Sequence, residues 1–280
     1  MKTIFITGAT SGIGEASAKL FLNKNWKVIA SGRNQEKLEL LKELGAETYR
    51  LDVTNEQDIN KLFTELNEAG TKIDVVLNNA GYGQFGTIEE VSDSLAKKQF
   101  ETNVFGLASV CRAAIPILRN NGGGRIINVS SVAGFVSMPG GGWYAASKHS
   151  VKALSDALRW ETKQFGIKVS MIEPGPIKTG FADTVNSNMV NNENGVYSSL
   201  VKDLTKSTLS FGGGTVNHCA KKIYRAATRR CPKNRYMVTK EAYLIKFLIH
   251  ALPPKVLDYF VIKMFIPALK VYAKTKKSAN

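Results

Sequence analysis

The sequence predicts an α/β fold: a doubly wound parallel sheet of the Rossmann type, with helices on both faces and a basic helical C-terminal extension. Two observations predict the sheet. Short apolar runs alternate with segments of helical length, and a glycine-rich turn directly follows the first run. Parallel strands need a crossover of helical length, so this alternation is typical of βαβ units. Residues 1 to about 180 are expected to form this doubly wound unit.

The expected strands are the apolar runs, and the segments between them, such as 56–69, have helical length. The runs lie at residues 2–7, 27–32, 47–53, 72–81, 124–131 and 167–175. No internal repeat interrupts them. We expect one domain over residues 1–240 and an extension over 241–280. Residues 182–215 are rich in Asn and Ser, and are interpreted equally well as a substrate lid or an ordinary surface excursion.

Composition narrows the class of protein. The chain has 280 residues, 44% of them hydrophobic, which is enough to build a large core. It has no run of about 18 apolar residues and no secretory signal at MKTIFITG, so a cytoplasmic location is expected. No metal site is expected, because three cysteines and three histidines are isolated and match no ligand spacing: Cys111, Cys219, Cys231, His149, His218 and His250.

The net charge of +15 is concentrated at one end of the chain. Residues 221–280 contain fifteen Lys or Arg and two acids, Glu241 and Asp258. Of the totals of 38 and 23, this leaves 23 basic and 21 acidic residues for the first 220. The asymmetry indicates an anionic partner for the C-terminal part, not a basic protein as a whole.

The first chemical motif is TGATSGIG, from Thr7 to Gly14, between the first strand and the first helix. Glycines allow a phosphate to approach the backbone closely, and the helix that follows points its free N–H groups at the anion. The spacing is Gly-x-x-x-Gly-x-Gly, which differs from the generic Gly-x-Gly-x-x-Gly fingerprint. In its strand–turn–helix context, the motif favours dinucleotide binding over a plain tight turn.

Four motifs in order resemble those of classical short-chain dehydrogenases/reductases: TGATSGIG, NNAG at 78–81, YAASK at 144–148 and PGPIKT at 174–179. The resemblance covers roughly residues 1–180. Within the family, the residues around the motifs resemble those of the branch that contains 17β-hydroxysteroid dehydrogenase-like and retinol dehydrogenase-like members.

The resemblance implies a set of cofactor-binding residues. Asp52 and Val53 would lie beside the adenine, while Asn78 would mainly steady the sheet. The other implied residues are Gly8, Thr10, Ser11, Gly12, Ile13 and Gly14 in the first turn, Asn79, Ala80 and Gly81 beside the adenosine ribose, Pro174, Gly175, Ile177 and Thr179 at the nicotinamide end, and Tyr144 and Lys148.

The end of the second strand bears on which nicotinamide is bound. NAD-selective sites usually place an acid there, which accepts a hydrogen bond from the ribose 2′-OH. This chain has Gly32 at that place and Arg33 next to it. A guanidinium can bind a 2′-phosphate through paired charge-assisted hydrogen bonds, so NADP(H) is favoured over NAD(H). A solvated loop arginine is the alternative interpretation.

Tyr144 and Lys148 are four residues apart, so on a helix they lie on one face. A nearby cation favours phenolate and is expected to lower the pKa of Tyr144. The tyrosine can also donate its proton to a carbonyl oxygen in the reductive direction. Three glycines and Trp143 precede it in GGGWY (140–144), either loosening the loop or supplying an aromatic wall.

Two further positions complete the expected catalytic group. Ser131 ends a predicted parallel strand, where its hydroxyl can hydrogen-bond the substrate oxygen. Ser130 is adjacent, but the family spacing favours Ser131. The resemblance implies that Asn103 belongs to a proton relay through water. The expected activity is hydride transfer between the nicotinamide and a carbonyl or secondary alcohol of an apolar small molecule, and NADP use favours reduction.

The apolar stretch 241–273 predicts two amphipathic helices that meet at Pro253-Pro254. They either cover the cleft or an interface between subunits, which we favour, or contact an anionic membrane peripherally. Nucleic acid is disfavoured, because no motif for it accompanies the charge.

Two rival functions stay open: a 3-oxoacyl-thioester reductase acting on an acyl carrier, and a non-enzymatic NADP(H)-binding regulatory or membrane-adaptor protein. The resemblance also implies a homodimer or homotetramer that pairs through helices near 104–119 and 145–165.

Overall fold

A computed structural model describes residues 1–178, 187–190, 192, 195–198 and 213–265, with no account of side chains at 178 and 260–265. Its main element is a seven-stranded parallel sheet, which confirms the predicted fold class. The strands run in the order β3 (Glu47–Arg50), β2 (Lys27–Gly32), β1 (Thr3–Thr7), β4 (Val75–Asn78), β5 (Gly124–Val129), β6 (Ile167–Glu173) and β9 (Arg235–Met237). A short pair, β7 (Ile177–Lys178) and β8 (Gly214–Thr215), lies outside this sheet.

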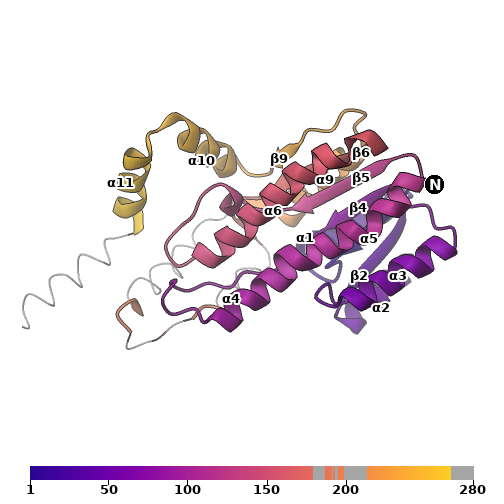
Figure 1. The fold of residues 1–280 in the computed structure, drawn as a ribbon, viewed down its shortest axis with the longest axis horizontal. Helices are drawn as coiled ribbons and strands as arrows, with labels where there is room; N and C mark the ends of the chain where they lie inside the picture. The colour runs from indigo at the N-terminus through magenta and orange to yellow at the C-terminus, as the bar shows by residue number, and fades with distance from the viewer. Residues whose placement is uncertain (179–186, 191, 193–194, 199–212, 266–280) are drawn as a thin grey trace, which may run out of the picture.

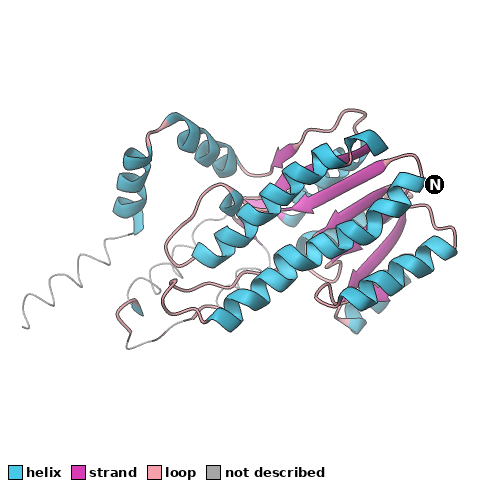
Figure 2. Cartoon of the chain, in the orientation of Figure 1, coloured by secondary structure: helices cyan, strands magenta, loops and turns pink. Residues whose placement is uncertain are grey.

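Helices cover both faces of the sheet (Figures 1 and 2). One apolar cluster joins the sheet to α3 (Glu56–Glu68), α5 (Leu107–Asn120) and α6 (Gly142–Glu161). The other joins it to α1 (Gly12–Leu22), α2 (Gln35–Glu43) and α9 (Val216–Thr228). Successive residues of β1 alternate between the clusters, with Phe5 in the first and Ile4 and Ile6 in the second, as the twofold period of a strand requires.

The strand order places a crevice at the middle of the sheet. The chain runs outward from β1 through β2 to β3 and then returns to β4 on the other side of β1. Ligands of open α/β sheets bind at such a reversal, beyond the carboxyl ends of the strands. The first two predicted motifs, TGATSGIG and NNAG, therefore meet where β1 and β4 end.

A buried polar chain ties the central strands together. Asn78 on β4 donates to Asn128 Oδ1 on β5 at 2.9 Å, and Asn128 Nδ2 donates to Ser155 Oγ on α6 at 2.8 Å. These bonds pair both amide nitrogens and the Asn128 oxygen, which would otherwise be costly to bury, whereas Asn78 Oδ1 has no partner among the described residues. Asn78 thus links β4 to β5, as the sheet-steadying role expected of it would require.

Several strands are shorter than the sequence predicts. The run 72–81 provides only Val75–Asn78, and 167–175 provides Ile167–Glu173. Asn79 leaves the sheet because its side-chain amide donates to the carbonyls of Thr7 and Gly8, at 3.2 and 3.0 Å.

Beyond the crevice, α4 (Asp93–Phe100) leads into a π-helical turn, Glu101–Gly106, which continues as α5. Two 3-10 turns, Val132–Gly134 and Lys163–Phe165, precede and follow α6.

The C-terminal part forms the two helices predicted around Pro253-Pro254, α10 (Lys240–Ala251) and α11 (Pro254–Phe265). Figure 1 shows them at one end of the molecule, away from the centre of the sheet. Ala242 is the one buried residue of α10, so most of this helix faces solvent in the part of the chain that the structure describes. No helix of the described residues is long and apolar enough to span a membrane.

Candidate active site

The glycine-rich turn packs tightly against the motif at the end of β4. Gly8 adopts φ +63°, and a Cβ there would lie 2.8 Å from Ala80 Cα. A Cβ on Gly14 would lie only 2.2 Å from the carbonyl oxygen of Gly8. Glycine is required at both positions, because the neighbouring backbone lies too close to leave room for the Cβ of any other residue.

Gly12 differs from its neighbours in the turn. It also has a left-handed φ of +53°, but a Cβ built on it meets nothing within 4 Å. This open space lies at the first residue of α1, and Ser11 at the N-cap makes no side-chain capping bond. The turn therefore fits a dinucleotide pyrophosphate, which needs room beside an N-terminal helical turn.

Hydrogen bonds join this turn to NNAG. Thr7 Oγ1 accepts from the backbone N–H groups of Asn79 and Ala80, at 3.0 and 3.1 Å. The side chain of Asn79 caps the carbonyls of Thr7 and Gly8 from the other side. The structure thus brings the first two predicted motifs together, with Gly81 directly beyond them.

The end of β2 lies beside the same turn. A Cβ at Gly32 would come within 2.7 Å of Thr10 Cγ2, so an acidic side chain cannot occupy that position unless Thr10 moves. Arg33 is exposed, and its Nη1 lies 3.6 Å from Asp52 Oδ2. Burial opposes ionisation of Asp52, but hydrogen bonds from Thr54 and the Arg33 charge together hold its pKa below the ordinary value. Val53, the neighbour of Asp52, is buried.

The pair that opens α6 is arranged as its spacing predicts. Lys148 Nζ lies 5.8 Å from the ring centroid of Tyr144 and donates to the carbonyl of Val129 at 3.1 Å. Ser131 follows β5, and its side chain is hydrogen-bonded to Tyr144. Ser130 is buried and donates instead to the backbone carbonyl of Lys148 at 3.3 Å. Of the two serines, Ser131 is therefore the one that reaches the tyrosine.

The expected direction of the Tyr144 pKa is wrong. Burial raises the pKa of Tyr144 to about 12, and the hydrogen bond with Ser131 lowers it only in part. Burial also lowers the pKa of Lys148 to about 8, because a charged ammonium is costly to enclose. The protein alone therefore keeps the phenol protonated at neutral pH.

Asn103 lies in the π-helical turn between α4 and α5. Its Oδ1 accepts from Tyr82 N at 3.0 Å, and its Nδ2 donates to Tyr82 O at 2.9 Å and to Ser147 Oγ at 3.1 Å. A Cβ on Gly81 would lie 2.9 Å from Asn103 Oδ1 and 3.6 Å from Lys148 Nζ. Asn103 is thus connected to the predicted catalytic group by its hydrogen bond to Ser147, the neighbour of Lys148 on α6. Its part in a water relay remains a prediction.

Apolar side chains that the sequence analysis missed lie beside Tyr144. The Phe85 ring lies 5.3 Å from the Tyr144 ring, and Ile88 is largely exposed next to Gly142, where a Cβ would approach it to 2.7 Å. Trp143 instead packs edge-on against Phe100 at 6.4 Å. No motif marks Phe85 or Ile88, and only the folded chain brings Phe85 to the tyrosine and Ile88 to Gly142.

The remaining predicted residues follow β6. The carbonyl of Pro174 accepts from Val132 N at 2.9 Å, which fixes this segment beside Ser131. Gly175 is closely packed, since a Cβ there would lie 2.3 Å from Thr239 Oγ1. Ile177 pairs with Gly214 in the small sheet. Thr179 and most of 182–215 lie outside the described residues. No group of three or more metal-ligating side chains occurs in the ranges described.

Comparison with known proteins supports the same grouping. The family model for short chain dehydrogenase matches residues 2–190. A probable short-chain type dehydrogenase/reductase of Helicobacter pylori, VdlC, is 35% identical over 254 residues, 89% of this chain and 92% of that protein. The NADPH-dependent 3-dehydrocapnine reductase of Ornithobacterium rhinotracheale is 31% identical over 281 residues, 96% and 98% of the two chains. The 3-ketodihydrosphingosine reductase of Bacteroides thetaiotaomicron is 34% identical over 198 residues, 69% and 71%.

Solved structures share the architecture. A short-chain dehydrogenase from Streptomyces avermitilis has a TM-score of 0.79 at 28% identity and covers 100% of this chain and 98% of its own. Serine dehydrogenase complexed with NADP⁺ has a TM-score of 0.74 at 28% identity, covering 84% and 93%. A short-chain dehydrogenase/reductase from Burkholderia phymatum in complex with NAD has a TM-score of 0.74 at 30% identity, covering 88% and 91%. Structural relatives thus bind either nicotinamide. On the family match and the shared fold, this chain belongs to the short-chain dehydrogenase/reductase family of oxidoreductases.

Proposed function

We propose that this chain is an NADPH-dependent reductase of apolar ketones or aldehydes, with Tyr144 as the proton donor. The observation that carries the proposal is the hydrogen bond between Ser131 and Tyr144, beside a buried Lys148 at the carboxyl end of β5. In one crevice, a phenol can protonate a carbonyl oxygen and a hydroxyl can hold that oxygen by a hydrogen bond. An ammonium beside them can balance the negative charge that develops.

Each side chain has a distinct part in the proposed reduction. Tyr144, with its pKa raised to about 12, carries the proton at neutral pH and donates it to the substrate oxygen. Ser131 orients that oxygen through a second hydrogen bond. Lys148, close to Gly81, would hold the nicotinamide ribose and offset the negative charge left on the phenol. NADPH, when bound, would supply the hydride.

The preference for NADPH rests on the end of β2. Thr10 crowds the position where an NAD-selective enzyme places an acidic side chain. The side chain of Arg33 is exposed, so its guanidinium can turn toward a 2′-phosphate. A relative described as NADPH-dependent is similar over 96% of this chain, which supports the same choice.

An apolar substrate suits the surroundings of Tyr144. Phe85 stacks beside it, and Ile88 and Met138 are exposed large hydrophobic residues of nearby loops. Two relatives are named for the reduction of a 3-dehydro and a 3-keto compound. We therefore propose a ketone on a long apolar chain, with 3-ketodihydrosphingosine as the first compound to test.

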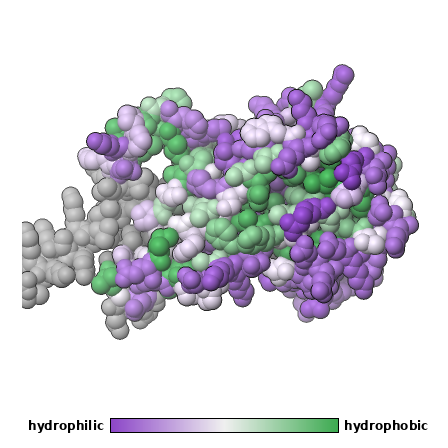
Figure 3. All heavy atoms as spheres, viewed as in Figure 1, coloured by the Kyte–Doolittle hydropathy of each residue, from purple (hydrophilic) through white to green (hydrophobic). Residues whose placement is uncertain are grey.

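We further propose that the chain pairs through α5 and α6. Large hydrophobic residues are exposed on or beside these helices: Phe105, Leu154 and Trp160. Figure 3 shows hydrophobic residues across the middle of the face on which Figure 1 draws α5 and α6. Apolar surface of this kind is typical of subunit interfaces. Sedimentation of Leu154→Glu should show a smaller species than the wild type.

The experiment that tests the reductase follows NADPH oxidation with long-chain 3-ketones, aliphatic aldehydes and steroid ketones, and repeats each assay with NADH. We expect turnover that prefers NADPH. Tyr144→Phe should lower kcat/KM about a thousandfold while NADPH still binds, because the general acid is lost but the cofactor contacts remain. Tyr243→Phe, a matched change on α10, should leave turnover unchanged.

Two results would contradict the proposal. If Tyr144→Phe kept wild-type turnover, another group would be the acid. If NADPH bound by calorimetry but no carbonyl compound, free or carried on an acyl carrier, were reduced, the chain would be a cofactor-binding protein without this activity.

A further inference from the structure

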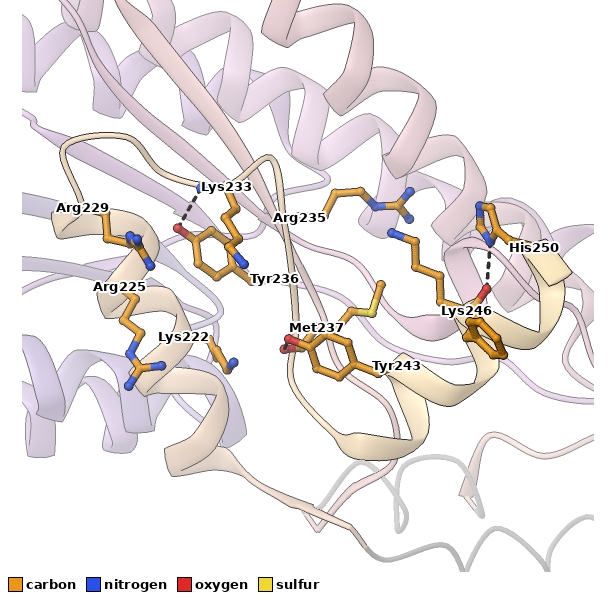
Figure 4. Close-up of a pocket in the computed structure, with 11 residues that line it drawn as sticks. Lys222, Arg225, Arg229, Lys233, Arg235, Tyr236, Met237, Tyr243, Lys246 and His250 are labelled. Atoms are coloured by element: carbon orange, nitrogen blue, oxygen red, sulfur yellow. Dashed lines mark hydrogen bonds between the residues drawn. The ribbon is translucent and has the colours of Figure 1, made fainter.

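A basic pocket of about 480 Å³ lies at the C-terminal corner of the fold, between α9, β9 and α10 (Figure 4). None of its lining residues belongs to the glycine turn or to the group around Tyr144. Six of them are cationic: Lys222, Arg225, Arg229, Lys233, Arg235 and Lys246. None of the described residues that line it is acidic, so their charge in this hollow has one sign.

The spacing on α9 explains how these cations come together. Lys222, Arg225 and Arg229 are three and four residues apart, which places them along one face of the helix. The opposite face is buried, through residues such as Ile223 and Ala226, in the cluster that holds α1. Figure 4 shows the three basic side chains along α9, with Lys246 and His250 of α10 across the pocket.

The charge of the pocket is largely uncompensated. Arg235 forms an ion pair with Glu173, with Nη2 and Oε1 2.5 Å apart. The other five cations form no ion pair with any carboxylate among the residues that the structure describes. Like charges gathered in a hollow repel one another and concentrate the field, so the pocket favours an anion.

Apolar side chains on α10 lie at the rim of the pocket and face solvent. Tyr243 and Phe247 line the pocket and are 54% and 67% exposed, and Leu244 between them is 58% exposed. An exposed aromatic and aliphatic group beside basic residues is typical of helices that lie on a membrane surface. A nucleic-acid or acidic-protein surface would leave this apolar area in water.

We propose that the basic pocket binds the phosphate of an anionic lipid headgroup and that α10 lies on the membrane surface. Basic side chains of α9 and α10 would contact the phosphate, while Leu244 and Phe247 would enter the boundary of the acyl chains. This inference is independent of the proposed reductase activity, because none of its residues belongs to that site.

The test is co-sedimentation of the full chain with vesicles of phosphatidylcholine alone or with added phosphatidylglycerol. We expect binding only to the anionic vesicles. Each basic side chain near such a surface contributes about a fivefold factor, so Lys222→Gln, Arg225→Gln and Lys246→Gln combined should weaken binding on the order of 100-fold. The matched control changes Lys42, Lys61 and Lys97, on α2, α3 and α4, to Gln. It removes the same charge and should weaken binding less than about threefold.

A second pair of variants tests the apolar contact. Leu244→Ser with Phe247→Ser should reduce vesicle binding about tenfold or more, because two large apolar groups no longer enter the lipid. Leu40→Ser with Leu44→Ser, at α2 and 50% and 54% exposed, should leave binding unchanged. NADPH binding of every variant, measured by calorimetry, reports whether the domain is still folded.

Three outcomes would overturn the proposal. Equal losses in the basic triple variant and its control would mean that net charge, not the pocket, attracts the vesicles. If inorganic phosphate bound to the pocket but the full chain bound no vesicles, the pocket would be assigned to a free phosphate compound. Binding of an acidic acyl carrier protein instead of vesicles would assign it to a protein partner.

Discussion

The crevice around Tyr144 and the basic pocket at the C-terminal corner handle charge in opposite ways. In the crevice the cation beside Tyr144, Lys148, is 6% exposed and is bonded to a backbone carbonyl. In the pocket Arg225, Arg229 and Lys233 are exposed to water, and no acid lies among the lining residues. The first arrangement fixes one charge at one place, whereas the second spreads several charges over a surface.

This difference teaches what each region is suited to do. A buried, hydrogen-bonded group acts at short range in a low dielectric, where a shift of pKa or position has a large effect. Exposed cations act at longer range, and salt screens them. A reaction at one atom suits the crevice, and adsorption to a charged surface suits the pocket.

The largest effect that would sharpen the comparison is expected in the packed turn of the crevice. Gly14→Ala places a Cβ 2.2 Å from Gly8 O, so the free energy of unfolding should fall by about 3 kcal/mol. Gly12→Ala meets no neighbour and should cost about 1 kcal/mol, from the left-handed backbone alone. Urea denaturation of both variants measures the difference. Equal losses would mean that the turn can relax.

The next effect is the pH dependence of stability that Lys148 confers. The folded protein releases this proton near pH 8, while the unfolded chain keeps it to about 10.5, so the unfolded state binds more protons between these values. Stability contributed by Lys148 therefore rises with pH, by about 2 kcal/mol from pH 7 to 9.5. Cys111 and Cys219 oppose this rise from about pH 9 upward, because burial raises the pKa of each thiol from 9.0 to about 12. The opposing contribution of Tyr144, whose pKa is raised from 10.0 to about 12, lies at higher pH than this window.

Urea denaturation of the wild type and of Lys148→Met at both pH values, without cofactor, measures this contribution as the difference between the two proteins. The change in the free energy of unfolding from pH 7 to 9.5 should be about 2 kcal/mol less favourable in Lys148→Met than in the wild type, and unchanged in Lys246→Met, the corresponding change on α10. Equal changes with pH in the wild type and Lys148→Met would show that Lys148 makes no such contribution.

A smaller effect tests the exposed edge of the crevice, where it most resembles the basic pocket. Arg33→Ala should lower kcat/KM for NADPH roughly tenfold and leave that for NADH unchanged, since only the 2′-phosphate is lost as a partner. Solvent exposure limits the effect. Arg50→Ala, on the neighbouring strand, is the control. Similar losses with both cofactors would remove Arg33 from the 2′-phosphate site.

The smallest effect is expected from salt on the chemistry itself. Raising salt from about 0.01 to about 0.15 M shortens the screening length from ~30 to ~8 Å. Vesicle binding should weaken at least about tenfold, whereas kcat at saturating NADPH with a neutral ketone should change less than about twofold. A kcat that followed vesicle binding would erase the distinction between the two regions.

Local spacing allowed much of the crevice to be predicted from the sequence. The interval of four between Tyr144 and Lys148 places them on one helical face, and the glycines of the first turn indicate close backbone contacts. The buried strands were recognisable from their apolar runs. Their ends were not, because a side chain such as Asn79 leaves the sheet for partners more than seventy residues away.

Long-range packing accounts for what could not be predicted. The raised pKa of Tyr144 depends on burial by parts of the chain, such as Phe85, that share no motif with it. For the basic pocket, counting charges indicated an anionic partner, but only the fold brings Lys222 of α9 opposite Lys246 of α10.

The π-helical turn from Glu101 to Gly106 has a consequence for insertions and deletions. A π turn holds one residue more than an α turn, so deleting one residue here would restore a regular helix. The helices on either side, α4 and α5, would keep their relative register, because the π turn already absorbs the extra residue. Gln99 on α4, whose Oε1 accepts from Gln84 N at 2.6 Å, would keep its place, and the change would fall on the turn itself. Asn103 would lose Tyr82 and Ser147 together. A one-codon deletion here should therefore do more damage than one at the open turn of Gly70, and chain length at this point is constrained more strictly than residue identity.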